Sequence, residues 1–204
     1  ITTTTPPGTT LATRGDGGID TPWQISTCEE LQELNDPKYL YNASSPFNYV
    51  LVNDIDCTNL VNANPDTGFV PIKQTVLAPD YSFGQAAINP QYFDGRNHTI
   101  TGLTIKSSGP RVGLFESVSP LTTVKNLKIK NANIVGENLV YAYTGTVSAT
   151  IDGTLENVEV SSANISTKNS SGSTGGLVGS NYGHIIRSST TGTINKDVGQ
   201  SGNL

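Results

Sequence analysis

Hydrophobic and polar residues alternate with a period of two over short stretches of the segment Gly175–Ile194. This alternation predicts one strand at Gly176–Gly179, a tight turn at Asn181-Tyr182-Gly183, a second strand at His184–Arg187 and a third strand that begins near Gly192. A segment this short has no core of its own. Its apolar residues can be buried only if similar segments stack above or below it.

The chain repeats at about 31 residues, which is the spacing that such stacking requires. Gly145-Thr146-Val147 precedes Gly176-Leu177-Val178 by this interval, and Lys125–Ile134 matches Glu156–Ile165 at the same interval. Strands and turns that keep one period predict a solenoid. Each coil is expected to pair with the next through parallel hydrogen bonds, about 4.8 Å apart.

The repeated residues resemble a known family. Gly176–Ser188, followed by Gly192-Thr193-Ile194, is similar to the GLUG repeat of bacterial surface proteins, and four upstream stretches resemble the region that precedes such repeats: Cys28–Leu31, Tyr49–Cys57, Phe93–Ile100 and Val112–Phe115. The likeness covers roughly residues 23–194, although Gly145–Ser148 departs from the motif. It implies an all-β, right-handed parallel β-helix of the kind found on secreted adhesins, large repeat proteins and non-catalytic parts of secreted proteases. It implies no single activity.

The pattern divides the chain into four parts. Residues 1–20 are a Thr- and Gly-rich tail or linker, 21–57 a cap helix and first strand, 58–91 a loop excursion, and 92–204 the GLUG-like coils. The excursion is the best candidate for a contact surface, because long loops of repeat proteins often carry binding. In the coils, alternation predicts a common interior for nine residues: Leu103, Ile105, Leu114, Leu127, Ile129, Val158, Val160, Leu177 and Ile185.

The cap contains both cysteines of the chain. Ser26-Thr27-Cys28-Glu29 predicts a capping box that opens a short helix ending before Asn35-Asp36-Pro37. This helix needs apolar cover and is expected to lie over the strand Tyr49–Cys57, which brings Cys28 close to Cys57. A disulfide there would close a loop of about 30 residues. The alternative is a pair of buried free thiols in a reducing compartment.

Composition and charge narrow the function classes. Charged residues make up 14% of the chain and the net charge is -5, which argues against nucleic-acid binding. Lys125, Lys128 and Lys130 are expected on one strand at an exposed edge, as a solvated face. No apolar run approaches the about 20 residues that a membrane span needs. The chain has no signal peptide and no Met, so an exported protein would already be processed.

Candidate chemistry is limited to a few carboxylates and two histidines. Asp54 and Asp56 are expected to share one face of a strand, with Asp94 and Glu116 elsewhere. Paired carboxylates can bind Ca²⁺ or serve as acid and base in a glycosidase, but Asp94-Gly95 also reads as a turn. His98 and His184 have no ligand at zinc spacing in the sequence. We therefore predict no catalytic residue, metal site or cofactor.

Asparagines recur at matching positions of the repeat: Asn126, Asn133, Asn157, Asn164 and Asn181. Side-chain amides at one position of stacked coils can hydrogen-bond to each other along the axis and to turn backbone. Possible N-glycosylation sites occur at Asn42, Asn97, Asn164 and Asn169.

Two classes of function fit these features. The first is a secreted or cell-surface structural and interaction protein, an adhesin or filament subunit. Its partners would be other copies, stacked head to tail, or surface glycans and proteins. Ile1–Thr5 is β-prone and could add a strand to a neighbouring copy. The second class is a β-helix polysaccharide-degrading enzyme or the non-catalytic carbohydrate-binding part of one.

Overall fold

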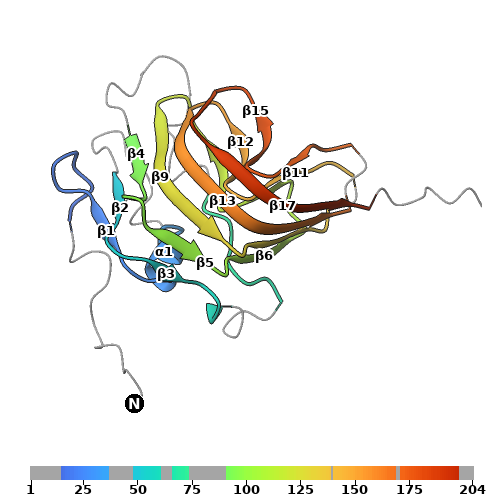
Figure 1. Cartoon of the computed structure of the whole chain (residues 1–204), viewed down its shortest axis with the longest axis horizontal. Helices are drawn as coiled ribbons and strands as arrows, with labels where there is room; N and C mark the ends of the chain where they lie inside the picture. Colours follow the sequence, from blue (N-terminus) through green and yellow to red (C-terminus); the bar gives the residue numbers. More distant parts are fainter. Residues whose placement is uncertain are drawn as a thin grey trace, which may run out of the picture.

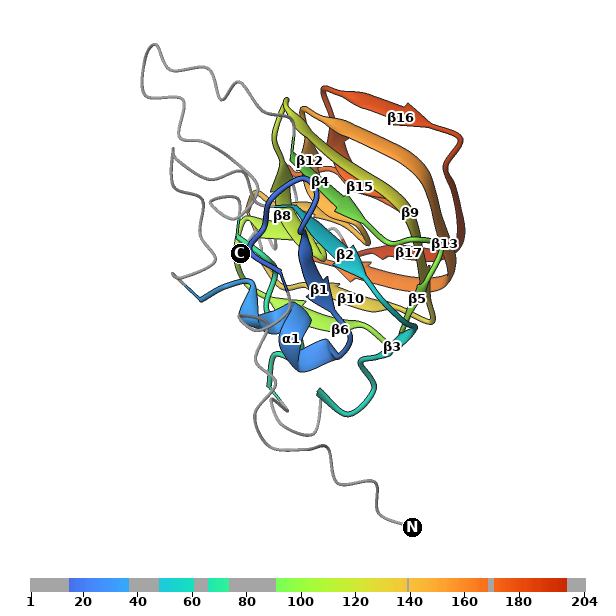
Figure 2. The same cartoon turned by 90° about the vertical axis from the view of Figure 1, so that its left-hand side faces the viewer.

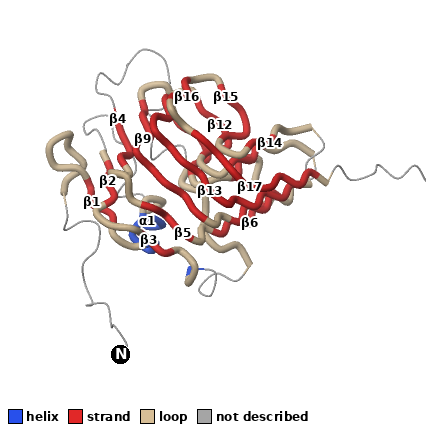
Figure 3. Tube along the Cα trace, viewed as in Figure 1, coloured by secondary structure: helices blue, strands red, loops and turns tan. Residues whose placement is uncertain are grey.

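The computed structural model describes residues 15–36, 48–60, 66–73, 91–138, 140–168 and 171–197. Nearly all of the regular structure is β, and the strands stack as a parallel solenoid of about five turns (Figures 1 and 3). This confirms the predicted fold class. The stack runs from β1 at one end to β17 at the other, and the coils in between lie side by side in chain order (Figure 1).

The strands form three sheets. The largest has eleven strands: β1 (Trp23–Ile25), β2 (Tyr49–Leu51), β3 (Ile55–Asp56), β4 (Gln91–Asp94), β5 (Thr99–Thr101), β6 (Thr104–Ser107), β9 (Thr122–Lys130), β10 (Asn133–Gly136), β13 (Thr154–Thr167), β16 (His184–Ile186) and β17 (Ser189–Lys196). The second contains β7 (Arg111–Val112), β11 (Tyr143–Gly145) and β14 (Thr174–Gly175), and the third β8 (Phe115–Val118), β12 (Ser148–Ile151) and β15 (Val178–Asn181).

Single residues in the left-handed region turn the corners of the coils. Asn126 and Asn157 have φ of 50° and 54° and lie inside the long strands β9 and β13, so each strand bends without ending. One corner further on, Asn131 and Ser162 have φ of 54° and 55°. Asparagine tolerates this backbone region better than most residues. The recurrence of asparagine in the repeat is therefore partly a requirement of the backbone.

The interior is built from columns of apolar side chains in register. Tyr49, Phe93, Val124 and Leu155 follow one another across β2, β4, β9 and β13. The ring of Phe93 packs edge-on against Phe115 with the centroids 5.3 Å apart, and all five of these side chains are fully buried. Because each coil covers its neighbours, the period of the sequence becomes one continuous core.

Seven of the nine residues predicted to be interior are buried, from Leu103 to Val160. The prediction was wrong for Ile185, which is 37% exposed, and Leu177 is only partly buried against the core. Both lie in the last described coil. Ile185 pairs with Leu155 on one side, and no described residue stacks on its other side. Alternation assigns a face of the coil, whereas burial also requires a coil on each side.

The helix α1 (Cys28–Glu33) covers the N-terminal end of the stack (Figure 2). Its N-cap is Thr27, whose Oγ1 accepts from the Glu30 amide at 3.2 Å. The Glu30 carboxylate accepts a hydrogen bond from the Ser26 amide at 2.7 Å. The capping residue predicted at Ser26 is therefore Thr27, one position later, and the Glu30 side chain bonds the amide of the residue before the cap rather than that of the cap itself.

Other local predictions needed correction. A strand precedes the cap helix, since β1 pairs in parallel with β2 and holds Trp23. The single strand expected over Tyr49–Cys57 is two strands, β2 and β3. In the last coil, β15 begins at Val178 rather than Gly176, β16 lies where it was expected, and β17 begins at Ser189 rather than near Gly192. Short apolar runs define faces well but strand ends poorly.

Candidate functional site

The disulfide joins the cap to the first coils. Cys28 and Cys57 are bonded, with their Cα atoms 5.2 Å apart, and both side chains are buried. The prediction of a bridge is confirmed over the alternative of two free thiols. It links the first residue of α1 to the residue that follows β3. The helix is thereby held across the end of the solenoid.

A polar clamp at the C-terminal end of α1 reinforces this link. The Gln32 side-chain amide pairs with the backbone of Val70, donating to its carbonyl at 3.0 Å and accepting from its amide at 2.7 Å. Asn35 accepts from the Lys73 amide at 3.0 Å and donates to the Pro71 carbonyl at 3.2 Å. The cap therefore consists of α1 together with residues 66–73.

Between Leu60 and Gln91, residues 66–73 are the described part of the excursion 58–91, which was expected to carry a contact surface. They pack into the core instead. Phe69 and Ile72 are fully buried, and their amides donate to the carbonyls of Thr104 and Leu114, each at 2.8 Å. Residues 61–65 and 74–90 lie outside the described residues, so a contact surface there remains a prediction.

Asp54 and Asp56 do not act as a pair. Asp54 precedes β3, accepts from the Thr99 amide at 2.9 Å and lies 3.2 Å from Nδ1 of His98. Asp56 accepts from the amide of Thr58 at 2.9 Å, which makes a local turn. These hydrogen bonds, first those from Thr99 and from the Thr58 hydroxyl, lower the pKa of both carboxyl groups. Asp54 and Asp56 are both exposed and flank the buried Ile55, as expected for residues on one face, but Asp54 lies before β3 rather than in the same strand, and each carboxylate has its own partners.

The contact between His98 and Asp54 was missed by sequence reasoning, which looked only for ligands at short spacing. It arises because β3 and β5 are paired in parallel, with Ile55 opposite Ile100. The Asp54 side chain is 74% exposed, so the contact contributes little to stability. Within the described ranges, no group of three or more His, Cys, Asp or Glu side chains could hold a metal ion.

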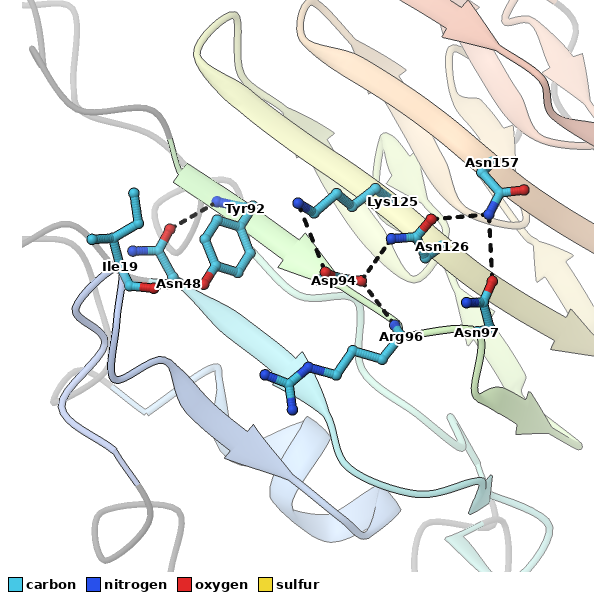
Figure 4. Close-up of polar contacts among 9 residues, drawn as sticks. All are labelled: Ile19, Asn48, Tyr92, Asp94, Arg96, Asn97, Lys125, Asn126 and Asn157. Atoms are coloured by element: carbon cyan, nitrogen blue, oxygen red, sulfur yellow. Dashed lines mark hydrogen bonds and ion pairs between the residues drawn. The ribbon is translucent and has the colours of Figure 1, made fainter.

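Asp94 is the end of a polar ladder that runs along the axis (Figure 4). Its Oδ1 accepts from the Arg96 amide at 2.8 Å and from Nδ2 of Asn126 at 3.0 Å. Nδ2 of Asn157 in turn donates to Oδ1 of Asn126 at 2.9 Å. A second ladder joins Asn164 to Asn133 at 3.4 Å. The predicted axial bonding of asparagines is confirmed for these pairs, and Asn181 instead accepts from the Gly183 amide in a turn.

Charges alternate along the same row of the surface. Nζ of Lys125 lies 3.7 Å from Oδ2 of Asp94, and Arg187 pairs with Glu156. In coil order the charges are therefore negative at Asp94, positive at Lys125, negative at Glu156 and positive at Arg187. Lys125 also lies 4.9 Å above the ring of Tyr92. The lysines were expected at a sheet edge, and this was wrong. Their strand β9 is flanked by β4 and β5 on one side and by β13 on the other, so it is not an edge strand.

Of the four possible glycosylation sites, Asn97 and Asn164 are described and both are exposed. Asn97 accepts from Asn157, and Asn164 donates to Asn133, so both side chains belong to the ladders. Asn42 and Asn169 lie outside the described residues. Modification at any of the four remains a prediction.

The last described coil exposes apolar side chains and strand edges. Ile186 and Ile194 are 40% and 48% exposed, and every residue of β16 and β17 is exposed. A shallow hollow at this face is lined by Gly176 and by residues of β13 and β17, among them Ala163, Ile165 and Ile194. Among the described helices, none has the length and apolar character to cross a membrane. Among the described residues, β16 and β17 pair only with β13, so their outer edges are left uncovered.

Comparison with known proteins finds a relative in sequence and a solved structure of similar fold. No family model matches the sequence. The chain is 33% identical over 173 residues to Halomucin from Haloquadratum walsbyi, a match that covers 83% of this chain. It spans only 2% of the length of that curated relative.

A solved structure supports the fold. A candidate immunoglobulin A1 protease from Bacteroides ovatus superposes with a TM-score of 0.54 and 15% sequence identity, over 89% of this chain and 61% of that one. At this level of identity the likeness concerns the architecture and no activity.

Proposed function

We propose that this chain is an extracellular structural and interaction module of a cell-surface protein of the adhesin type. The observation that carries the proposal is the covalently closed cap, in which the Cys28–Cys57 bond holds α1 across one end of the solenoid. Structural disulfides persist in oxidising compartments and are rare in reducing ones. The likeness to Halomucin over most of the chain and the resemblance of Gly176–Ile194 to GLUG repeats support the same assignment.

The proposed role is mechanical and adhesive rather than catalytic. The polar groups that sequence reasoning singled out already have structural tasks: Asp94 ends the ladder, Asp56 makes a turn and Asp54 accepts from Thr99. Axial ladders of amides and alternating charges tie each coil to the next. A rod built in this way can hold a binding surface at a fixed distance from its point of attachment.

As partners we propose other copies of the chain, or surface proteins and glycans. The exposed strands β16 and β17 are the side of the solenoid at which a neighbouring strand could pair. A head-to-tail contact would set β17, which has eight residues, against β1, which has three. The addition of a strand from Ile1–Thr5 is a further proposal, and that segment lies outside the described residues.

Labelling of intact source cells tests the location. Antibodies raised against the folded chain should stain unpermeabilised cells, and a membrane-impermeant protease should remove that staining. Staining only after permeabilisation would overturn the proposal. Separately, incubation of the purified chain with a panel of polysaccharides should release no new reducing or unsaturated ends. Release of such ends would favour the alternative, a β-helix polysaccharide-degrading enzyme.

A further inference from the structure

Three tyrosines gather on the surface where β11 and β15 are in contact. In this tyrosine cluster, Tyr141 and Tyr182 are 48% and 67% exposed, and Tyr143 lies between them. The rings of Tyr141 and Tyr143 meet edge to face with their centroids 5.1 Å apart. The largest buried aromatic side chains of the described residues lie in the core instead: Tyr49, Phe69, Phe93 and Phe115. Apolar rings left together in solvent mark an interaction surface.

The hydroxyl groups of the cluster bond to one another. The hydroxyl of Tyr143 is hydrogen-bonded to those of Tyr141 and Tyr182, and these two bonds, that to Tyr141 first, raise its pKa above the usual value. The hydroxyl of Tyr182 also bonds to Ser180, which lowers the pKa of Tyr182. The cluster therefore combines ring faces with a connected set of hydroxyl donors and acceptors at their rim.

The backbone amide of each tyrosine is held by a hydrogen bond, within the same coil for Tyr141 and to the preceding coil for Tyr143 and Tyr182. Oδ1 of Asn138 accepts from the amides of Val140 and Tyr141 at 3.0 and 3.1 Å, and its Nδ2 donates to the Ser108 carbonyl at 3.1 Å. The Tyr143 amide donates to the Pro110 carbonyl at 2.9 Å, and the Tyr182 amide to the Ile151 carbonyl at 2.8 Å. A surface fixed in this way loses little conformational entropy when a ligand binds.

A carboxylate completes the surface. Asp152 follows β12, is exposed and comes next to Tyr182 in the stacking register, because Ile151 pairs with Asn181 and its carbonyl accepts from the Tyr182 amide. A carboxylate accepts hydrogen bonds from ligand hydroxyls and repels an anionic ligand. The ligand that suits the site has an apolar face to lie on tyrosine rings and hydroxyl groups around its edge.

We propose that the tyrosine cluster, together with Asp152, is a binding site for the pyranose rings of neutral oligosaccharide chains. A sugar ring offers axial C–H groups on its face and hydroxyls on its rim, which match the ring faces and the polar rim of the cluster. The site is an open surface rather than a pocket and suits an extended chain laid across the coils. The proposal assigns a site and a sugar class to the glycan binding proposed above and rests on that part of the proposed function, while it is independent of the surface location.

The test measures binding of cellohexaose, chitohexaose and mannohexaose to the full chain by isothermal titration and by saturation-transfer NMR, with hexagalacturonic acid as the acidic probe. At least one neutral hexasaccharide should bind, and the acidic probe should not. Tyr182→Ala should weaken binding roughly three- to tenfold, the effect expected for one aromatic contact. The double variant Tyr141→Ala/Tyr182→Ala should bind at least tenfold more weakly, and Asp152→Asn should also lose affinity.

The matched control is Ile19→Ala. Ile19 is 60% exposed, lies near the other end of the stack and uses only its carbonyl oxygen, which accepts from Tyr92. This variant should bind as the unaltered chain does. Circular dichroism must show that each variant keeps its fold, which is expected because Tyr141 and Tyr182 lie outside the core. If none of the neutral probes binds, or if the tyrosine variants and Ile19→Ala bind alike, the proposal is overturned, whatever the outcome of the cell-surface labelling.

Discussion

Removing the disulfide by the double substitution Cys28→Ala/Cys57→Ala should destabilise the cap without altering the coils beyond it. The two residues are separated by 29 positions in sequence. The chain-entropy relation for a loop of this length gives roughly 3.6 kcal/mol of stabilisation at 25 °C. Alanine keeps both positions apolar and small, so most of the loss should come from the restored freedom of the unfolded chain rather than from a cavity.

Urea unfolding can follow the cap and the coils separately. Trp23 is the only tryptophan and lies in β1, so its fluorescence reports on the capped end. Far-UV circular dichroism reports on all the strands. In the variant, the fluorescence transition should move to lower urea than the dichroism transition, because solenoid units can unfold in succession when their coupling is weakened. The clamp of Gln32 and Asn35 on residues 70–73 should keep the cap folded in the absence of urea.

Reduction of the unaltered protein with dithiothreitol is the matched control, since it breaks the same bond and leaves both side chains in place. It should reproduce the effect of the double substitution. The prediction is wrong if the free energies of unfolding obtained from the fluorescence transitions of the reduced protein and of the variant lie within about 1 kcal/mol of the value for the oxidised protein, which is well below the stabilisation expected from loop entropy.

Three further predictions follow from particular contacts. Asn157→Ala should lower the free energy of unfolding by roughly 2 to 3 kcal/mol, because alanine must adopt a left-handed backbone and the hydrogen bond to Asn126 is lost, whereas Asn157→Gly should lower it by only about 1 kcal/mol. Chemical denaturation measures both variants, and equal losses of stability would contradict the backbone argument. Phe93→Ala should cost about 3 to 5 kcal/mol through the cavity it leaves in the core, against less than about 1 for the exposed control Ile186→Ala in the same assay. The Thr99 amide lowers the folded-state pKa of Asp54, so its stabilising contribution is present above the unfolded-state value of about 3.9 and disappears as the pH falls through the folded-state value. Melting temperatures of the unaltered chain and Asp54→Asn should therefore differ slightly at pH 6 and converge as the pH is lowered through the acid range, and a difference that does not change with pH would contradict this assignment.

The architecture could be read from the sequence because its cause is local and repeated. Alternation at Leu127-Lys128-Ile129 and at Val158-Glu159-Val160 sets the inward and outward faces of the strands, and the interval between them sets the register in which they stack. Asparagines at this interval carry enough information to predict axial bonding. The bridge between Cys28 and Cys57 followed from the need of an amphipathic helix for cover. These features can be predicted from the repeat interval, from the alternation of apolar and polar residues, and from the positions of the two cysteines.

The tertiary structure decided what depends on neighbours far away in sequence. Ile185 has the alternation of a core residue but lacks a coil on one side, so its exposure could not be read from its own segment. His98 meets Asp54 only because β3 and β5 pair across the long excursion. In residues 66–73 no alternating pattern marks Phe69 and Ile72 as buried. They lie in the core because their backbone amides donate to the carbonyls of Thr104 and Leu114 in the next coil.

The tyrosine cluster shows the same division. Tyr141 and Tyr143 are close in sequence, and alternation alone places their side chains on one face. Tyr182 lies one coil further along and reaches them because β11 and β15, which belong to different sheets, are in contact. The sequence by itself therefore determined the period, the faces and the covalent bridge, which are properties of single segments. Which exposed side chains meet was decided by the path of the coil, because stacking brings together residues that no short segment contains.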